Sequence, residues 1–310
     1  MRLSKLLTHI DGITPASAAG GGDPDIRRIY YRSQDVRPGG LFVAIRGLAA
    51  DGHDFIGDAL ARGALAVVAQ NRVPGDDRII RVPDSRLALA QLAASFYGDP
   101  TANLTLIGVT GTNGKTTVTY LVESILVAAG LPSGVIGTNN CRYAGKVIDS
   151  PVTTPESLDL QRLLAEMRTG GVSHVAMEVS SHGIDLKRVA SCRFDVGAFT
   201  NLTQDHLDYH GTMADYWACK RGFFTGHLPR GSKAGGSTAV INMDNSHGRE
   251  LFALLGSSDG PPGLVSYGRD SGNDIHAADM SIDLSGIRGA IVTPEGTVPF
   301  RSPLVGEHNM

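Results

Sequence analysis

The chain has 310 residues, a length typical of about two domains that can each bury a hydrophobic core. Hydrophobic residues make up 42% of it and charged residues 19%, and the formal net charge is −3, which is typical of a globular protein and argues against the basic surface of nucleic-acid-binding proteins. Three unevenly spaced cysteines predict neither a disulfide framework nor a zinc site, and no signal sequence or run of about 18 apolar residues is found, so we expect a cytoplasmic protein without a membrane anchor.

Residues 1–99 are expected to form a small α/β domain, because short apolar strands alternate there with helical segments. Strands are predicted at residues 41–45 (LFVAI) and 65–69 (LAVVA). Helices are predicted at residues 54–63 (DFIGDALARG) and 85–98 (SRLALAQLAASFYG). Asp99-Pro100 then interrupts the pattern, so we place a domain boundary between residues 99 and 100.

A second domain, residues 100–310, is predicted to begin with a strand, a glycine-rich loop and a helix. The strand covers residues 104–110 (LTLIGVT), and the helix covers residues 116–129 and stops at Gly130. This order suits a phosphate-binding loop, because backbone N–H groups and the positive end of the helix point at one spot. Lys115 would then reach the β- and γ-phosphates of a nucleotide, and the Thr116 hydroxyl would bind Mg²⁺.

The spacing of this loop departs from the standard G-x-x-x-x-G-K-[ST] pattern. That pattern requires a glycine at position 109, where this chain has Val109, and the nearest glycines are Gly108 and Gly111. A glycine turn with an incidental lysine is the alternative interpretation. The intact Gly-Lys-Thr at 114–116, with its flanking strand and helix, favours phosphate binding.

Polar side chains follow two further predicted strands. Residues 174–179 (HVAMEV) contain Glu178 near their end, and residues 195–202 (DVGAFTNL) precede Asp205 and His206. If these strands run parallel to the one at 104–110, both groups lie at the sheet edge that carries the glycine loop, where open parallel sheets bind ligands. A carboxylate there is a typical Mg²⁺ ligand. His206 is equally well explained as a hydrogen-bonding loop residue, and the pattern around Lys220 alone predicts a solvated lysine on a helix.

Several segments together resemble the Mur ligase family, and within it the ligases that add the third residue of the peptidoglycan stem peptide. They are GTNGKTT (111–117), TTPESLDLQ (153–161), MEVSSHGIDLKRV (177–189) and FTNLTQDHLDYHGTMADYWACKRGFF (199–224). RPGGLFVAIRGLAADGHDFIGDALARGA (37–64) is similar to the UDP-binding domain of that family. The resemblance covers nearly the whole chain. It implies an α/β fold, with a small N-terminal α/β UDP-binding domain followed by a P-loop-type, mostly parallel sheet domain with flanking helices.

The resemblance implies a role for each matching residue. For the ATP phosphates it implies Gly111, Thr112, Asn113, Gly114, Lys115, Thr116 and Thr117, with Asn242 on the nucleotide side. For Mg²⁺ it implies Thr116, Glu178, His206 and Lys220, the last as a carbamate formed with CO₂. For the UDP-muramoyl dipeptide it implies Ser33, Thr153, Thr154, Ser180 and Arg188. The implied catalytic set is Lys115, Glu178, His206 and Lys220.

The implied reaction is an ATP-dependent amide ligation. ATP would convert the γ-carboxylate of UDP-N-acetylmuramoyl-L-alanyl-D-glutamate into an acyl phosphate, which the amine of a diamino acid then attacks. Family frequency favours meso-diaminopimelate over lysine as that amino acid. Magnesium ions and Lys115 would offset the repulsion between triphosphate and carboxylate. We expect a monomer with no nucleic-acid or membrane partner.

Two departures from the family pattern limit these expectations. Arg32-Ser33-Gln34 stands where the family usually has Asp-Ser-Arg, so only the serine of that motif is retained. The family's third domain, which selects the amino acid, has no counterpart in the sequence, and VGEHNM (305–310) resembles the linker that leads into it. We therefore expect an incomplete fragment. The alternatives are a non-catalytic fragment that binds the UDP substrate and ATP, and a stand-alone P-loop kinase or NTPase.

Overall fold

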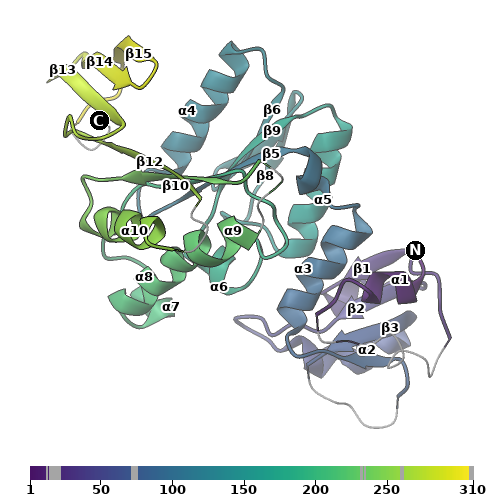
Figure 1. The fold of residues 1–310 in the computed structure, drawn as a ribbon. Coiled ribbons are helices and arrows are strands. Elements are labelled where there is room, and N and C mark those ends of the chain that lie inside the picture. Colours follow the sequence, from purple (N-terminus) through teal and green to yellow (C-terminus); the bar gives the residue numbers. More distant parts are fainter. Residues whose placement is uncertain are drawn as a thin grey trace. The chain divides into compact units, whose positions relative to one another are not determined.

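The computed structural model describes residues 1–11, 13, 22–70, 76–230, 233, 235–258 and 262–306. These residues form two compact units, both drawn in Figure 1, and each unit is described by itself. Of the segment 305–310 that resembles an interdomain linker, residues 307–310 lie outside the described residues.

The first unit is built on a sheet of four parallel strands that follow the order of the chain. The strands are β1 (Arg28–Tyr30), β2 (Gly40–Val43), β3 (Ala64–Ala69) and β4 (Ile79–Arg81). The helices are α1 (Leu3–Leu7), α2 (Ile56–Ala61), α3 (Ser85–Phe96) and α5 (Ser157–Thr169), and 3₁₀ turns cover η2 (Ser33–Asp35), η3 (Gly52–Phe55) and η4 (Pro100–Asn103). The two strands and two helices predicted for residues 1–99 are all confirmed, with ends that differ by a few residues.

Both faces of this sheet are covered, as is usual for parallel strands. Every residue of β2 is buried, and successive side chains point to opposite faces. Leu41 and Val43 belong to a core cluster with residues of α1 and α3, whereas Phe42 belongs to a second cluster with Ala59 of α2. The apolar run LFVAI is therefore explained by burial on two sides.

The first unit contains two segments from later in the chain. It comprises Met1–Ala102 together with Pro155–Gly170 and Asp185–Cys192, so a single boundary between residues 99 and 100 does not describe how contacts are grouped. The physical reason is that α5 packs along α3, and Leu158 of α5 joins the core cluster that contains Leu89 and Leu92.

The second unit contains an eleven-stranded sheet of order β15-β14-β13-β12-β11-β10-β5-β9-β6-β7-β8. Its strands are β5 (Thr105–Thr110), β6 (Ser133–Ile136), β7 (Asn140–Tyr143), β8 (Lys146–Asp149), β9 (His174–Glu178), β10 (Val196–Phe199), β11 (Thr238–Asn242), β12 (Gly263–Gly268), β13 (Ile275–Asp283), β14 (Gly286–Thr293) and β15 (Gly296–Ser302). β5 lies between β10 and β9 and is parallel to both. The parallel arrangement expected for the three strands that precede the polar clusters is confirmed.

Helices cover both faces of this sheet (Figure 1). They are α4 (Lys115–Ala128), α6 (Ser181–Asp185), α7 (Leu207–His210), α8 (Met213–Gly222), α9 (Leu228–Arg230) and α10 (Ser246–Gly256), with a π-helical turn at Phe223–His227. α4 connects β5 to β6 in one direction along the sheet, and α10 connects β11 to β12 in the other. Because such crossovers are right-handed, the two helices lie on opposite faces. Among the described residues, no helix is long and apolar enough to cross a membrane.

Antiparallel strands extend both ends of the parallel core, and the sequence analysis did not predict them. β7 and β8 form a hairpin whose turn residues Ala144 and Gly145 have φ of +47° and +76°. Such a turn normally carries Asn-Gly or Asp-Gly, so Ala-Gly gives little signal. At the other end, β13, β14 and β15 form an antiparallel meander.

Candidate functional site

The glycine loop connects β5 to α4 in the middle of the second unit's sheet. Gly111 has a φ of +148° and Gly114 a φ of +86°, in the region that favours glycine. A Cβ atom on Gly111 would lie 2.0 Å from Thr200 Oγ1, far inside van der Waals contact. Gly111 is therefore needed both for its positive φ and for the close approach of Thr200. The helix α4 begins directly after the loop, at Lys115.

Hydrogen bonds tie this loop to the segment that follows β10. The backbone N–H of Thr112 donates to the Asn201 carbonyl over 2.9 Å, and that of Asn113 donates to Asn201 Oδ1 over 3.0 Å. In the other direction, the Thr200 hydroxyl donates to the Asn113 carbonyl over 2.6 Å. The chain leaves β5 and β10 in opposite directions along the sheet, which is the switch point where open α/β sheets bind ligands.

Two lysine amines converge on one carbonyl of the loop. Lys115 Nζ donates to the carbonyls of Gly111 and Thr112 over 3.0 and 2.9 Å, and Lys220 Nζ donates to the same Gly111 carbonyl over 2.8 Å. The prediction from pattern alone that Lys220 is solvated is wrong, because its side chain is 1% exposed. The helical pattern missed this because α8 is apolar on more than one side, with Tyr216 and Trp217 also buried.

Burial changes the proton affinity of both amines. Loss of hydration, and to a smaller extent the nearby Lys115 charge, together lower the pKa of Lys220 from 10.5 to about 7. Burial also lowers the pKa of Lys115, while Glu178 and Asp205 act in the opposite sense. Near neutral pH, a substantial fraction of Lys220 is therefore the neutral amine, which is the nucleophilic form.

Glu178 places a buried carboxylate beside the start of α4. It ends β9 and is 1% exposed. The Thr116 hydroxyl donates to Glu178 Oε1 over 2.9 Å, and Thr138 donates to the two carboxylate oxygens through its N–H (2.9 Å) and its hydroxyl (3.1 Å). Gly137 makes room for this carboxylate, because a Cβ atom there would lie 2.3 Å from Oε1.

His206 occupies the position before α7 with a left-handed backbone. Its φ is +52°, an uncommon conformation for a residue with a Cβ atom. Its ring lies edge-on to that of His182, with 5.1 Å between centroids, and Nε2 is 3.6 Å from Asp205 Oδ2. Strained residues of this kind cluster at functional sites.

These side chains line one polar cavity of about 220 Å³ within the second unit. Its lining consists of Thr112, Asn113, Gly114, Lys115, Thr116, Thr117, Thr138, Thr153, Glu178, Ser180, Ser181, His206 and Lys220. The structure thus brings together most of the residues that the sequence analysis singled out for phosphate, metal and catalysis. The cavity lies at the carboxyl ends of β5, β9 and β10.

The remaining candidates lie elsewhere. Thr154 is buried behind the cavity wall, where its hydroxyl donates to the Glu178 carbonyl over 2.9 Å and lies 3.1 Å from Ser180 Oγ. Asn242 ends β11 and donates to the Thr200 carbonyl over 2.7 Å, so it supports the segment that holds the glycine loop. Ser33 and Arg188 belong to the first unit, and the Ser33 hydroxyl binds Asp58.

Sequence reasoning missed Thr138 as a lining residue. It follows β6 (Ser133–Ile136), so the rule that polar residues after a buried strand gather at one sheet edge applies to it as well. The signal is weak because β6 has only four residues. Ser181, which follows β9 by three positions, also lines the cavity.

The donor set of the cavity fits a hard cation at one place. The Thr116 hydroxyl and the Glu178 carboxylate supply oxygen ligands, which Mg²⁺ prefers together with water and phosphate oxygens. Among the described residues, no group of three or more His, Cys, Asp or Glu side chains could hold a metal ion by itself. Lys220 offers nitrogen rather than oxygen, so it fits a Mg²⁺ site only after conversion to a carbamate.

Comparisons with known proteins agree with this architecture. The sequence profile of the Mur ligase middle domain matches residues 109–310, and that of the Mur ligase family catalytic domain matches residues 25–97. The UDP-N-acetylmuramoyl-L-alanyl-D-glutamate–2,6-diaminopimelate ligase of Geobacter metallireducens is 46% identical over 312 residues, covering 100% of this chain and 60% of that protein. The protein of the same name from Bacillus licheniformis is 40% identical, covering 100% and 62%. The chain thus spans about three fifths of the length of these relatives.

Solved structures show the same fold. A UDP-N-acetylmuramoyl-L-alanyl-D-glutamate–2,6-diaminopimelate ligase, 27% identical, matches all of this chain and 61% of its own chain with a TM-score of 0.83. A MurF ligase from Thermotoga maritima in complex with ADP, 24% identical, matches 89% of this chain and 58% of its own with a TM-score of 0.58. The second similarity concerns the fold alone.

Proposed function

This chain belongs to the Mur ligase family, and from that membership we propose that it forms the UDP-muramoyl- and ATP-binding part of a ligase. The ligase would add a diamino acid to UDP-N-acetylmuramoyl-L-alanyl-D-glutamate in peptidoglycan synthesis. The observation that carries the proposal is the single cavity that joins Lys115, Glu178 and Lys220 at the switch point of the sheet. The names of the relatives favour 2,6-diaminopimelate as the added amino acid, and we propose its meso form.

ATP would bind with its phosphates in the glycine loop. Backbone N–H groups at the start of α4 offer donors and a positive dipole to anions, whereas the N–H groups of Thr112 and Asn113 already bind Asn201. The Lys115 ammonium would contact the terminal phosphates once it leaves the loop carbonyls. Thr116 and Glu178 would hold Mg²⁺, which neutralises charge on the phosphates when bound. Thr117 and Asn242 are proposed to support the nucleotide.

The proposed chemistry is an activation followed by an acyl transfer. A carboxylate oxygen of the D-glutamate γ-carboxyl attacks the γ-phosphorus, and ADP leaves with the electron pair of the broken P–O bond. The amine of the diamino acid then attacks the acyl carbon, phosphate departs, and the nitrogen loses a proton. Lys115 offsets the repulsion between the two anions in the first step.

Lys220 is proposed to act as a carbamate. Its neutral amine would attack CO₂ and lose a proton, which replaces a cation by an anionic oxygen donor beside the loop. The lowered pKa supports this, because only the neutral amine reacts with CO₂. With His206, the carbamate would complete a second Mg²⁺ site. The UDP-muramoyl dipeptide would contact Ser33, Thr153, Ser180 and Arg188, and the buried Thr154 would act on it through Ser180. We also propose that the protein is a monomer in the cytoplasm.

Calorimetric titration tests this function. The chain is titrated with UDP-N-acetylmuramoyl-L-alanyl-D-glutamate and separately with a non-hydrolysable ATP analogue and Mg²⁺, and both should bind. Lys115→Met should abolish nucleotide binding, whereas Lys146→Met, on an exposed residue of the β7–β8 hairpin, should not. Lack of dipeptide binding by the wild-type chain would contradict the proposal. A phosphorylated product that forms from ATP without an amine would favour a kinase instead.

A further inference from the structure

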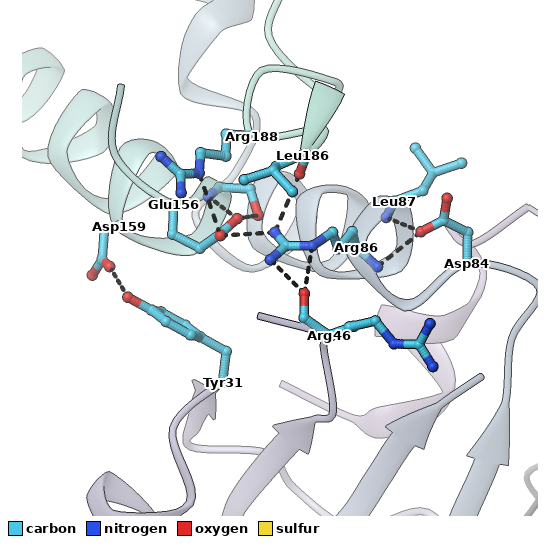
Figure 2. A network of polar contacts seen from close by, with 10 residues as sticks. Tyr31, Arg46, Asp84, Arg86, Leu87, Glu156, Asp159, Leu186 and Arg188 are labelled. Atoms are coloured by element: carbon cyan, nitrogen blue, oxygen red, sulfur yellow. Dashed lines mark hydrogen bonds and ion pairs between the residues drawn. The ribbon is translucent and has the colours of Figure 1, made fainter. Parts of the chain in front are cut away.

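We propose that Arg86 and Glu156 are positioning residues, which hold the guanidinium of Arg188 in place to receive a carboxylate of the UDP-linked dipeptide. The inference rests on the proposed function, in which Arg188 contacts that ligand. All three residues belong to the first unit, and Figure 2 shows their side chains meeting between α3, the start of α5 and the segment before Arg188. The sequence analysis singled out neither Arg86 nor Glu156.

The guanidinium of Arg86 binds three separate segments at once (Figure 2). Its Nε and Nη2 donate to the Arg46 carbonyl over 3.0 and 2.7 Å. Its Nη1 donates to Glu156 Oε2 over 3.0 Å and to the Leu186 carbonyl over 3.3 Å. The planar fork of an arginine can make these bonds together, whereas the single nitrogen of a lysine cannot.

Glu156 divides its two oxygens between a helix and two arginines. Oε1 accepts from the Ser157 N–H over 2.9 Å and caps α5. Oε2 lies 3.0 Å from Arg86 and 3.5 Å from Arg188 Nε. The side chains of Arg86, Glu156 and Arg188 are only 13%, 11% and 16% exposed, so solvent screens their charges weakly. Together they carry one excess positive charge, which suits an anionic ligand group.

The backbone that leads to Arg188 is held in a strained turn. Lys187 has a φ of +57°, which is uncommon for a residue with a Cβ atom. On one side of this residue, the Leu186 carbonyl accepts from Arg86. Lys187 Nζ lies 3.3 Å from Asp84 Oδ2. Asp84 also caps α3 by accepting a hydrogen bond from the Arg86 N–H. The first turn of α3 therefore maintains the conformation that precedes Arg188.

The three segments that Arg86 joins are those that the proposed function assigns to one ligand. Arg46 lies in the stretch similar to a UDP-binding domain, Glu156 follows Thr153 and Thr154 by a few positions, and Leu186 precedes Arg188 by two positions. Loss of the Arg86 guanidinium would leave Glu156 without its nearer partner, so the carboxylate could turn and its contact with Arg188 would be less well defined. We therefore expect such a loss to lower the affinity for the dipeptide carboxylate and to leave the affinity for the nucleotide unchanged.

Calorimetric titration of four variants with two ligands tests this inference. The variants are Arg86→Gln, Arg86→Lys, Glu156→Gln and Arg188→Gln, and the matched control is Arg78→Gln, which breaks an exposed arginine–aspartate pair of the same unit. The ligands are UDP-N-acetylmuramoyl-L-alanyl-D-glutamate and UDP-N-acetylglucosamine, which lacks the lactyl-peptide arm and its carboxylates. Thermal melting of each variant accompanies the titrations.

Each of the four variants should bind the dipeptide about ten- to a hundredfold more weakly, the range of a charged hydrogen bond, and bind UDP-N-acetylglucosamine as the wild type does. Arg86→Gln combined with Arg188→Gln should lose no more than Arg188→Gln alone. Equal losses for both ligands, or wild-type dipeptide affinity in Glu156→Gln and Arg86→Gln, would overturn the inference. If Arg86→Gln does not fold, the nearly isosteric Glu156→Gln decides. A wild-type chain that binds no dipeptide would refute the proposed function itself.

Discussion

Lys220 is only 1% exposed, although its side chain ends in an amine that is normally charged and hydrated. Its Nζ donates to the Gly111 carbonyl, and the ring of Tyr216 lies 4.8 Å away. No carboxylate binds this amine among the contacts of the described residues, so burial dominates and its pKa falls to about 7. The residue is therefore close to its titration midpoint at neutral pH.

This pKa predicts a stability profile that depends on pH. Between pH 7 and 10, the unfolded chain binds a proton at Lys220 that the folded chain does not, because the folded pKa lies below the unfolded value of 10.5. The free energy of unfolding should therefore rise as pH increases from about 7 to 10. Urea denaturation in CO₂-free buffer at several pH values measures this slope.

Lys220→Met should remove that part of the slope and make the chain more stable at pH 7. Lys146→Met is the matched control, because Lys146 is exposed, and it should keep the wild-type slope. Parallel profiles for the wild type and Lys220→Met would show that the buried amine stays protonated.

Gly111 has no room for a side chain in the glycine loop. Gly111→Ala adds a Cβ atom that would meet Thr200 Oγ1 at 2.0 Å, so the loop must move and nucleotide affinity should fall at least tenfold, measured by titration with an ATP analogue. Gly130→Ala is the control, because Gly130 also has a positive φ of +72° but no atom within 4 Å of the added Cβ. It should lose about 1 kcal/mol of stability and bind nucleotide normally. Equal nucleotide affinity in both variants would contradict the steric argument.

At the scale of elements, the β7–β8 hairpin is attached to the helix that follows the glycine loop. Arg142 of β7 forms an ion pair with Glu123 of α4, with Nε 2.9 Å from Oε1, and its guanidinium lies 3.7 Å from the centre of the Tyr120 ring. Both charged side chains are largely buried. The hairpin is followed by the loop that contains Thr153, and α4 begins with the lining residues Lys115 to Thr117, so this contact joins two elements that lie next to cavity-lining residues in the chain.

Arg142→Met should therefore destabilise the second unit by about 1–3 kcal/mol, because it leaves Glu123 without its partner and removes the cation–π contact. Arg162→Met is the control, since Arg162 forms exposed pairs with Asp159 and Glu166 on α5 and should cost less than about 1 kcal/mol. Urea denaturation measures both. A loss for Arg142→Met no larger than that of the control would show that the hairpin is attached by backbone pairing alone.

At the scale of the whole molecule, the candidate site follows from sheet topology. β5 is central, and the chain proceeds from it to β6 and β9 on one side and to β10 and β11 on the other. The loops that leave β5 and β10 therefore separate at the middle of the sheet and leave space for a ligand. Glu178 reaches this space because β9 pairs with β5.

Much of this site was predictable from the sequence because each part has a recognisable pattern among residues that are neighbours in the chain. The glycine loop lies between an apolar strand and a periodic helix, and Glu178 and His206 follow short apolar runs. The rule that parallel strands end at one edge then places them together. The helix α4 shows the limit of periodicity, since Leu121 and Ile125 at helical spacing are exposed, although the helix itself is confirmed.

The sequence by itself determined the elements of the parallel core, the glycine loop and the family resemblance, because these depend on residues that are neighbours in the chain. Only the tertiary structure decided that Lys220 is buried against Gly111, 109 positions away, that Thr138 binds Glu178 across 40 positions, and that α5 groups with the first unit. Burial and electrostatic fields arise from residues that are near in space. A pattern of chain neighbours therefore identifies the reactive side chains without stating their charge or their surroundings.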